Sequence, residues 1–376
     1  MKLGMLITSI GNFGKKGFYN AQEIGLAREM DKLFDEVILY KAVPESEERV
    51  VASLEGCSHT TFYQVPVKNQ GINGIWDCSV MNKTMDALLF FSDTQLSVPD
   101  VYQWCRQNSI PMYPYIGVIE SHSTNKIKKL VIDQMFKKNL KAYRECTCFV
   151  KTPTVQKALQ AKGVKNTVVT PVGLDVTLLR RDYADADIRE LKKKYGYQEQ
   201  DKVLLFIGRM TAEKQPMKMI EIFRKIYNTD SFYRLLMVGK GELLDEVKAT
   251  AEEINAEDSG KENSKVIQII EQIPNQDIWE LYRIADCFVN LNQLEIFGMA
   301  ILEAMYYGCK VVAMHAPGPD FIIEDGVSGY LAGSEEELLD KIRLDNTIRP
   351  HERIEKCFLW GSTARTMYET ITGRPA

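Results

Sequence analysis

One stretch of this sequence decides the fold, and it reads Glu295-Ile296-Phe297-Gly298-Met299-Ala300-Ile301-Leu302-Glu303-Ala304-Met305. It follows an apolar run at 287–291 that predicts a buried strand, and it opens a helix expected at 298–307. A strand that leads through a short loop into a helix is the repeating unit of an open α/β sheet. The backbone amides of Gly298, Met299 and Ala300 are then expected at a helix N-terminus, where they can bind an anion such as a diphosphate.

The same alternation of short apolar runs and longer segments of helical period extends over all 376 residues. In the second half, strands are expected at 203–207, 234–238, 266–270, 287–291 and 310–313, and helices at 217–227, 243–254, 275–284, 298–307 and 335–343. In the first half, strands are expected at 3–8, 36–40, 87–91, 112–118, 148–151 and 168–171, and helices at 21–34, 101–107 and 125–144. The fold class is therefore α/β, with two doubly wound Rossmann-like domains expected to face a ligand-binding cleft.

Domain boundaries follow from a change in composition near the middle of the chain. Residues 173–200 are polar and charged, and they contain no apolar run of strand length. We place the link at 171–175, which gives an N-terminal domain at 1–172 and a C-terminal domain at 173–345. The remaining residues, 346–376, are expected to form a helical segment and are a candidate to pack back on the N-terminal domain.

A second informative stretch also leads from a strand end into a helix, and it reads Phe206-Ile207-Gly208-Arg209-Met210-Thr211-Ala212-Glu213-Lys214. Arg209 offers a planar guanidinium for phosphate oxygens, and Lys214 offers a second, compact cation. Together they can neutralise the charge of a diphosphate. A surface salt bridge of Lys214 with Glu213 or Glu221 explains the same residues.

These two stretches resemble the family 4 retaining glycosyltransferases, which carry two glutamates eight residues apart around a Phe-Gly pair and an earlier Gly-Arg and Glu-Lys motif. The resemblance implies a GT-B fold whose C-terminal domain binds a nucleotide diphosphate sugar. In that scheme Glu303 accepts hydrogen bonds from the ribose and Glu295 holds the sugar hydroxyls. The segment Phe297, Gly298, Met299 and Ala300 contacts the donor. Taken alone, Glu295 also fits an exposed loop acid, and Glu303 fits a residue that complements the helix dipole.

Weaker matches to the family follow in the expected order. The resemblance places Gly239 in a tight turn after a strand, and Ile273 where backbone groups hold the nucleobase. It places Gly17 in a glycine-rich loop near the phosphates, although Lys15 and Lys16 stand where small residues are usual. His122 is expected near the reacting sugar, and a satisfied loop histidine is the alternative.

The residues favour substitution at the front face of the sugar, because nothing in the sequence supplies an obvious protein nucleophile for double displacement. Arg209, Lys214 and the helix amides would hold the leaving group, and Glu295 would position the sugar. UDP is the favoured carrier and GDP the second, and the acceptor is a glycan, a lipid-linked hydroxyl or another hydroxyl. We expect no permanently bound cofactor and no required metal, because the Asp-x-Asp pair of this sequence, Asp185-Ala186-Asp187, stands apart from both motif stretches that would face the diphosphate.

Composition limits the partners. The formal net charge is -4, which gives no global basic field and argues against a nucleic-acid partner. The short apolar N-terminus lacks the length of a signal or membrane segment, so a cytoplasmic location is expected. Residues 126–144 carry seven basic side chains and one acid, Asp133. This segment is a candidate for peripheral contact with the inner membrane face, or for an ordinary amphipathic helix with solvated lysines.

Two other functions compete with the transferase. An inactive, transferase-like partner or scaffold subunit could share the fold, although the intact Glu295, Glu303, Arg209 and Lys214 argue against it. A nicotinamide-dependent dehydrogenase is disfavoured because no Gly-x-Gly-x-x-Gly follows the first strand. The eight cysteines, with no Cys-x-x-Cys spacing, are expected to be reduced core thiols, including Cys146 and Cys148.

Overall fold

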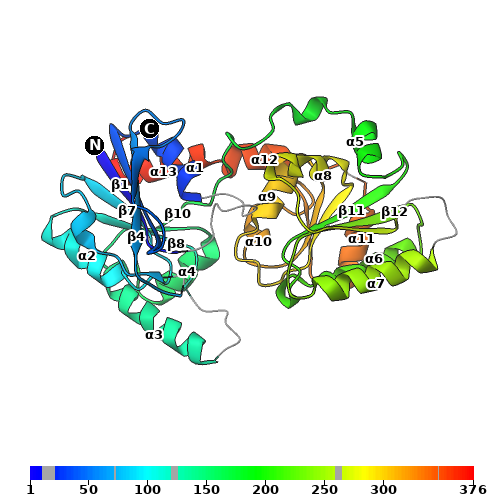
Figure 1. Ribbon diagram of the computed structural model, residues 1–376, viewed down its shortest axis with the longest axis horizontal. Coiled ribbons are helices and arrows are strands. Elements are labelled where there is room, and N and C mark those ends of the chain that lie inside the picture. Colours follow the sequence, from blue (N-terminus) through cyan, green and yellow to red (C-terminus); the bar gives the residue numbers. More distant parts are fainter. Residues whose placement is uncertain (11–21, 72, 120–125, 259–264, 346) are drawn as a thin grey trace. The chain divides into compact units, whose positions relative to one another are not determined.

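A computed structural model describes residues 1–10, 22–71, 73–119, 126–258, 265–345 and 347–376 (Figure 1). The chain divides into two units. Unit 1 comprises Met1–Asp175 together with Leu359–Ala376, and unit 2 comprises Val176–Phe358.

Unit 1 is built on an eight-stranded sheet with the order β10-β9-β8-β7-β1-β2-β4-β3. Its strands are β1 (Lys2–Ile7), β2 (Glu36–Pro44), β3 (Val50–Ser53), β4 (Thr60–Val67), β7 (Ala87–Phe91), β8 (Met112–Ile116), β9 (Cys148–Val150) and β10 (Thr167–Val169). Neighbouring strands are parallel except β3 and β4, which are antiparallel. The order reverses between β1 and β7, so unit 1 has a topological switch point there. A small separate pair, β5 (Asn69–Gln70) and β6 (Asn73–Gly74), is antiparallel.

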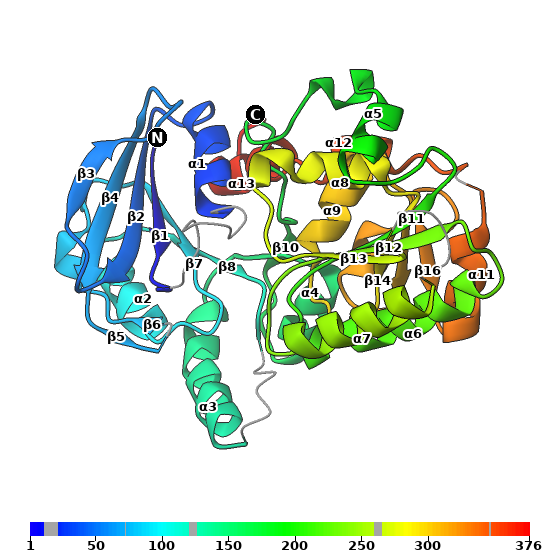
Figure 2. The same cartoon turned by 45° about the vertical axis from the view of Figure 1, so that its right-hand side comes forward.

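The helices of unit 1 are α1 (Gln22–Asp31), α2 (Val98–Gln107), α3 (Lys126–Tyr143), α4 (Pro153–Ala161) and α13 (Trp360–Thr372). Helices α2, α3 and α4 cover one face of the sheet, and α1 with α13 covers the other (Figure 2). The main core lies under α2 to α4, where Leu88 and Phe90 from β7 meet Val101 and Leu159. These side chains are fully buried. Their burial explains why the apolar runs of the strands were recognisable in the sequence.

Strands β3 and β4 were not among the expected elements. The sequence of β4, TTFYQVPV, mixes polar and apolar residues and contains Pro66. All four residues of β3 are exposed. Strand β3 is only four residues long and lies at the edge of the sheet, and β4 beside it has no continuous apolar run, so neither gave a clear strand pattern in the sequence.

The last helix of the chain packs in unit 1. The indole of Trp360 is 2% exposed and lies so close to Gly25 of α1 that a Cβ there would approach it to 2.7 Å. Oγ1 of Thr363 donates a hydrogen bond to the carbonyl of Pro171 at 2.7 Å. Arg28 forms an ion pair with Asp175 at 2.6 Å.

The structure divides the expected third segment, 346–376, between the two units. Helix α12 (Pro350–Cys357) packs on α9 in unit 2, whereas α13 packs on α1 in unit 1. The reason is that α12 and α13 each bury a separate apolar face, with Ile354 in the first and Trp360 and Met367 in the second. The division between the units after Asp175 falls at the end of the link expected at 171–175.

Unit 2 contains a six-stranded parallel sheet with the order β13-β12-β11-β14-β15-β16. Its strands are β11 (Lys202–Ile207), β12 (Tyr233–Val238), β13 (Ile267–Ile270), β14 (Cys287–Asn290), β15 (Val311–Met314) and β16 (Tyr330–Ala332). The order reverses between β11 and β14, so the switch point of this sheet lies at their carboxyl ends.

Helices cover both faces of this sheet. The helices are α5 (Ile188–Lys194), α6 (Pro216–Tyr227), α7 (Leu244–Glu257), α8 (Ile278–Ile284), α9 (Met299–Tyr306), α10 (Pro319–Ile322), α11 (Glu335–Arg343) and α12. Helices α6, α7 and α11 lie on one face, and α8, α9 and α12 lie on the other (Figures 1 and 2). The doubly wound α/β architecture expected from the sequence is therefore confirmed in both units.

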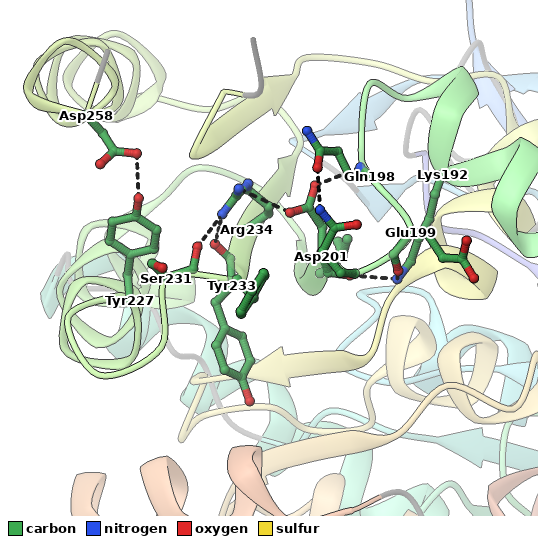
Figure 3. Close-up of polar contacts among 12 residues, drawn as sticks. Lys192, Gln198, Glu199, Asp201, Tyr227, Ser231, Tyr233, Arg234 and Asp258 are labelled. Carbon is green, nitrogen blue, oxygen red and sulfur yellow. Dashed lines mark hydrogen bonds and ion pairs between the residues drawn. The ribbon is translucent and has the colours of Figure 1, made fainter. Parts of the chain in front are cut away.

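Polar contacts attach the segment around α5 to the amino ends of β11 and β12 (Figure 3). The carboxylate of Asp201, 1% exposed, pairs with Arg234 at 3.1 Å and accepts a hydrogen bond from the backbone of Gln198 at 2.8 Å. Nζ of Lys192 donates to the carbonyl of Asp201 at 2.6 Å. This polar sequence therefore folds against the sheet, at the edge opposite to the switch point.

In the described parts of the chain, no helix combines the length and hydropathy that a membrane span requires.

Candidate functional site

The two motif stretches meet at the switch point of unit 2. Strands β11 and β14 are neighbours, with Leu204 opposite Cys287 and Leu205 opposite Phe288. Because the strands are parallel, the loops that follow them leave from the same edge of the sheet. Residues 208–215 after β11 and 291–298 after β14 therefore lie side by side.

A partly buried ion pair joins these loops. Nζ of Lys214 donates a hydrogen bond to Oε2 of Glu295 at 2.6 Å, and the two side chains are only 20% and 16% exposed. Glu213 is a distant second partner, with its carboxylate 3.9 Å from the same ammonium. Glu221 pairs with Lys218 instead. Lys214 therefore pairs most closely with Glu295 across the switch point, and not with a neighbouring acid as in the alternative interpretation of the sequence.

Asparagines shape the loop that presents Glu295. The side chain of Asn290 accepts from the backbone N–H of Asn292, and the side chain of Asn292 accepts from the N–H of Leu294, both at 2.9 Å. Nδ2 of Asn292 also donates to Oε2 of Glu295 at 3.2 Å. The N–H of Gly318 donates to the carbonyl of Glu295 at 2.8 Å. The loop is therefore held by side chains and backbone at several points, which orients the carboxylate.

The first turn of α9 begins at a residue that favours glycine. Gly298 has φ +102°, and a Cβ there would lie 2.9 Å from the side chain of Ile301. The chain can thus turn sharply from the loop into α9, whose first backbone amides have no acceptor within the helix. Met299 and Ala300 lie in this turn and are half-buried. Phe297 is 9% exposed and packs edge-on against Phe358 of the same unit.

Glu303 lies further along α9 and is buried, with 3% exposure. The hydroxyl of Tyr282, from α8, donates a hydrogen bond to Oε2 of Glu303 at 2.9 Å. The ring of Tyr307 stacks on Tyr282 with a centroid distance of 6.0 Å. Burial of a carboxylate is costly unless donors satisfy it, and this tyrosine supplies one of them.

A third loop packs on the first. Gly239 has φ +144°, and a Cβ on it would lie 1.9 Å from the carbonyl oxygen of Gly208. The N–H of Met210 donates to the carbonyl of Lys240 at 2.9 Å. The turn after β12 and the Gly208–Arg209 loop are therefore in backbone contact, which only glycine at 239 permits.

Arg209 differs from the other candidates because it is exposed. Its guanidinium lies 3.6 Å from Glu213, four residues further along the same loop, and both side chains are exposed. Such a pair contributes little to stability. Arg209 is therefore able to move toward a ligand at small cost.

The remaining candidates are Ile273, Gly17 and His122. Ile273 is half-buried and follows β13, the edge strand two positions from β11. Gly17 and His122 lie outside the described residues.

Sequence reasoning missed two residues that orient the candidate glutamates, Asn292 and Tyr282. The signal for Asn292 is its position three residues before Glu295 in an Asn-x-Asn loop, a pattern typical of Asx turns. Tyr282 carries no such local signal, because its contact with Glu303 depends on the packing of α8 on α9.

Comparison with known proteins gives a family match within unit 2, which contains the cluster. The family described as "Glycosyl transferases group 1" matches residues 187–352, which includes every element of the cluster. An N-acetyl-alpha-D-glucosaminyl L-malate synthase of Bacillus anthracis is 29% identical over 151 residues, which are 40% of this chain and 37% of that protein. An alpha-monoglucosyldiacylglycerol synthase of Streptococcus pneumoniae is 25% identical over 175 residues, 46% of this chain and 38% of that protein. The chain thus spans less than two fifths of each relative's length.

Solved structures show the fold over the whole chain. The HepE protein of Anabaena in complex with UDP has a TM-score of 0.70 at 18% identity and covers 100% of both chains. The sucrose-phosphate synthase of Thermosynechococcus elongatus has a TM-score of 0.71 at 14% identity and covers 98% of both chains. This likeness confirms the expected GT-B fold. Residues 187–352 of the chain match the glycosyl transferases group 1.

Proposed function

We propose that this protein is a retaining glycosyltransferase that moves a hexose or N-acetylhexosamine from a nucleotide diphosphate sugar to a hydroxyl acceptor. The observation that carries the proposal is the pairing of Lys214 with Glu295 at the switch point of unit 2. A cation for the leaving diphosphate and a carboxylate for the sugar hydroxyls are adjacent there. Ligands of open α/β sheets bind at such points.

UDP is the favoured carrier and GDP the second. The favoured choice draws support from Anabaena HepE, whose structures are complexes with UDP and with UDP-glucose. In our assignment the ribose hydroxyls donate to Glu303, and the diphosphate lies against the first turn of α9, with Gly298, Met299 and Ala300. Ile273 and Gly239 complete the proposed nucleotide contacts. Gly17 and His122 stay candidates of the same proposal.

The reaction proceeds by front-face substitution in this proposal. The bond between the anomeric carbon and the leaving phosphate oxygen breaks while the acceptor oxygen bonds to the same face of that carbon. The acceptor's proton passes to the departing phosphate oxygen. Lys214 and Arg209 stabilise the negative charge that develops on the diphosphate, and this electrostatic stabilisation is the main contribution of the protein.

The cations assigned to the leaving group are side chains, so the proposal includes no required metal and no permanently bound cofactor. We expect transfer from UDP-sugar to continue at an unchanged rate in excess chelator. A rate that disappears with chelator and returns with magnesium or manganese contradicts the assignment of Lys214 and Arg209.

The acceptor side of the proposal concerns unit 1. A glycan or a lipid-linked hydroxyl is proposed as acceptor, and the named product of one relative is a glucosylated diacylglycerol. Peripheral contact with the inner membrane face through 126–144 belongs to the same proposal, and Lys137, Lys138 and Lys141 of α3 are exposed. The test is co-sedimentation of the full chain with anionic vesicles, before and after these three lysines are replaced by Gln.

The alternative of an inactive partner subunit makes a different prediction. Titration with UDP, followed by an assay for UDP release from UDP-glucose and related donors, distinguishes the two. An enzyme binds UDP and releases it slowly by hydrolysis even without acceptor. A protein that binds no nucleotide diphosphate, or binds it without turnover on any donor, contradicts the proposed activity.

A further inference from the structure

Lys151 lies at the carboxyl edge of the sheet of unit 1, directly after β9. Its backbone N–H donates to the carbonyl of Ile116 at 3.0 Å, and its side chain is 15% exposed. The aliphatic stem crosses the end of the neighbouring strand β8, where a Cβ on Gly117 would lie 2.4 Å from its Cδ. Glycine at 117 is therefore what allows this lysine to lie flat across the strand end.

The stem carries the ammonium toward the switch point of unit 1. Nζ of Lys151 lies 3.8 Å from Oδ2 of Asp93, which follows β7, and 5.2 Å from the centre of the Tyr115 ring. Strand β7 is one of the two strands between which the order of the sheet reverses. The cation thus reaches from β9 past β8 to the edge where ligands of such sheets bind.

Other contacts hold Asp93 in place, and its carboxylate makes no hydrogen bond to the ammonium of Lys151. Its Oδ1 accepts hydrogen bonds from the backbone N–H groups of Gly117 at 2.5 Å and Val118 at 3.1 Å. Its carbonyl accepts from the hydroxyl of Tyr143 at 2.8 Å, and its backbone has φ +32°. A separation of 3.8 Å is too long for a hydrogen bond between the ammonium and the carboxylate.

Comparably buried lysines of this chain are bonded more closely. Lys41 donates to Glu23 at 2.6 Å, Lys192 to the carbonyl of Asp201 at 2.6 Å, and Lys310 to the carbonyl of Leu344 at 2.6 Å. Within the described ranges, Lys151 has no oxygen acceptor at such a distance. A partly desolvated ammonium is costly without acceptors, so its position indicates a place for an external anion.

A second observation lies at the adjoining strand end. Val169 of β10 is in register with Val150 of β9, so the next residues, Thr170 and Lys151, occupy neighbouring positions. Thr170 is completely buried, and its Oγ1 has no hydrogen-bond partner in the part of the chain that the structure describes. Buried hydroxyls are nearly always satisfied. This strand end therefore holds an unsatisfied buried donor next to the position of Lys151.

We propose that Lys151 anchors an oxyanion group, a phosphate or a carboxylate, on the acceptor substrate. This inference rests on the proposed function, because it assigns the acceptor to unit 1. Gly117 leaves room for the lysine stem, the Tyr115 ring lies beside the ammonium, and Asp93 keeps the ammonium at the switch point. The alternative is that Lys151 and Asp93 form only a structural ion pair, which predicts no response to added anions.

The test uses full-length protein carrying Lys214→Met, so that the diphosphate cation of unit 2 does not bind the probe. Thermal unfolding is followed in sodium phosphate and in sodium chloride at matched ionic strength. Phosphate should raise the unfolding midpoint above that in chloride, because a ligand that binds only the native state stabilises it. Adding Lys151→Met, which keeps the aliphatic stem, should weaken phosphate binding about tenfold, and Lys151→Arg should preserve it.

Lys41→Met is the matched control, since Lys41 is a buried lysine of unit 1 already paired with Glu23. It should lower the midpoint in both salts and leave the difference between phosphate and chloride unchanged. An equal phosphate effect with and without Lys151→Met overturns the proposal, and so does a parent that shows no effect of phosphate beyond chloride. UDP titration of the unmodified protein is a separate measurement, so failure of the proposed function is distinguishable from failure of this site.

Vesicle sedimentation then distinguishes the source of the anion once the phosphate effect is found. Phosphatidylcholine vesicles containing phosphatidylglycerol should retain the Lys151→Met protein as well as the parent if the anion belongs to a soluble acceptor. Loss of retention assigns it to a lipid headgroup.

Discussion

Nζ of Lys214 and Oε2 of Glu295 lie 2.6 Å apart although the residues are 81 positions apart in the sequence. The adjacency of β11 and β14 brings them together, and Asn292 holds the carboxylate from its other side at 3.2 Å. The ammonium is therefore placed by the fold of unit 2 and does not depend on a neighbour in its own helix. Four predictions concern this cluster and the core of unit 1.

Lys214→Met should weaken UDP binding by about 1.5–3 kcal/mol, because it removes a charged hydrogen bond to the diphosphate. Isothermal titration calorimetry measures the change. Lys218→Met is the control, since Lys218 pairs with Glu221 and Glu335 on the surface, both at 2.8 Å. Equal affinities of the Lys214 variant and the parent contradict the location of the donor site.

Tyr282→Phe should raise the KM for the donor about tenfold and leave kcat within about twofold. The reason is that Glu303 loses the hydroxyl that orients it for the ribose, a contact made equally in the ground and transition states. Tyr227→Phe is the control, because the hydroxyl of Tyr227 bonds to Asp258 in the group of contacts drawn in Figure 3. A Tyr282 variant with the parent's KM shows that Glu303 does not need this tyrosine.

Gly239→Ala should both destabilise unit 2 and abolish tight UDP binding. Alanine at φ +144° is strained, and its Cβ would collide with the carbonyl of Gly208. Gly196→Ala separates the two effects, since Gly196 has φ +83° with no atom within 4 Å of an added Cβ. The control should cost about 1–2 kcal/mol in urea unfolding and leave UDP affinity unchanged. Equal losses for the two variants indicate that the contact with Gly208 is unimportant.

Unit 1 should lose stability at high pH through its buried thiols. Burial raises the pKa of Cys105 from 9.0 to about 12, and it does the same for Cys146. The folded state holds these protons more tightly than the unfolded state. Their contribution is therefore complete below pH 9 and is lost as pH rises from 9 toward about 12.

Each such thiol makes the free energy of unfolding fall by up to about 1.4 kcal/mol per pH unit in this window. Urea unfolding at pH 9 and pH 10 measures the slope, and Cys105→Ala should reduce it by one thiol's share. An unchanged slope in the variant means that Cys105 titrates normally in the folded protein.

The strands of the two cores were predictable because nearly all their residues are buried, which produces continuous apolar runs such as Leu88 to Phe90. Helix α5 and strand β4 escaped prediction for the opposite reason. Helix α5 has no fully buried residue, and its surroundings are fixed by polar contacts such as Asp201 with Arg234.

The candidate site was predictable to the extent that its residues follow one another in the sequence. Glu295, Gly298 and Glu303 stand in one loop and helix, so the family resemblance could name them together, and the expected helix N-terminus alone predicted an anion-binding turn. The pairing of Lys214 with Glu295 could not be predicted from positions in the sequence. Only local acids, Glu213 and Glu221, were available to sequence reasoning, whereas Glu295 becomes a neighbour through the order of the strands. Tyr282 and Lys151 were missed for the same reason, because their contacts arise from packing between elements.

The packing of Trp360 against Gly25 has a consequence for synthesis on the ribosome. The segment Met1–Asp175 of unit 1 is translated before unit 2, yet unit 1 also needs Leu359–Ala376, which are translated after all of unit 2. Unit 2 is a continuous segment and can be completed while the indole site on α1 is still unfilled. Translation adds about 5–20 residues per second, so the nascent first unit waits many seconds with that apolar surface uncovered. Unit 1 is thus completed only after unit 2, and during this interval its uncovered surface on α1 is a site where a chaperone can bind.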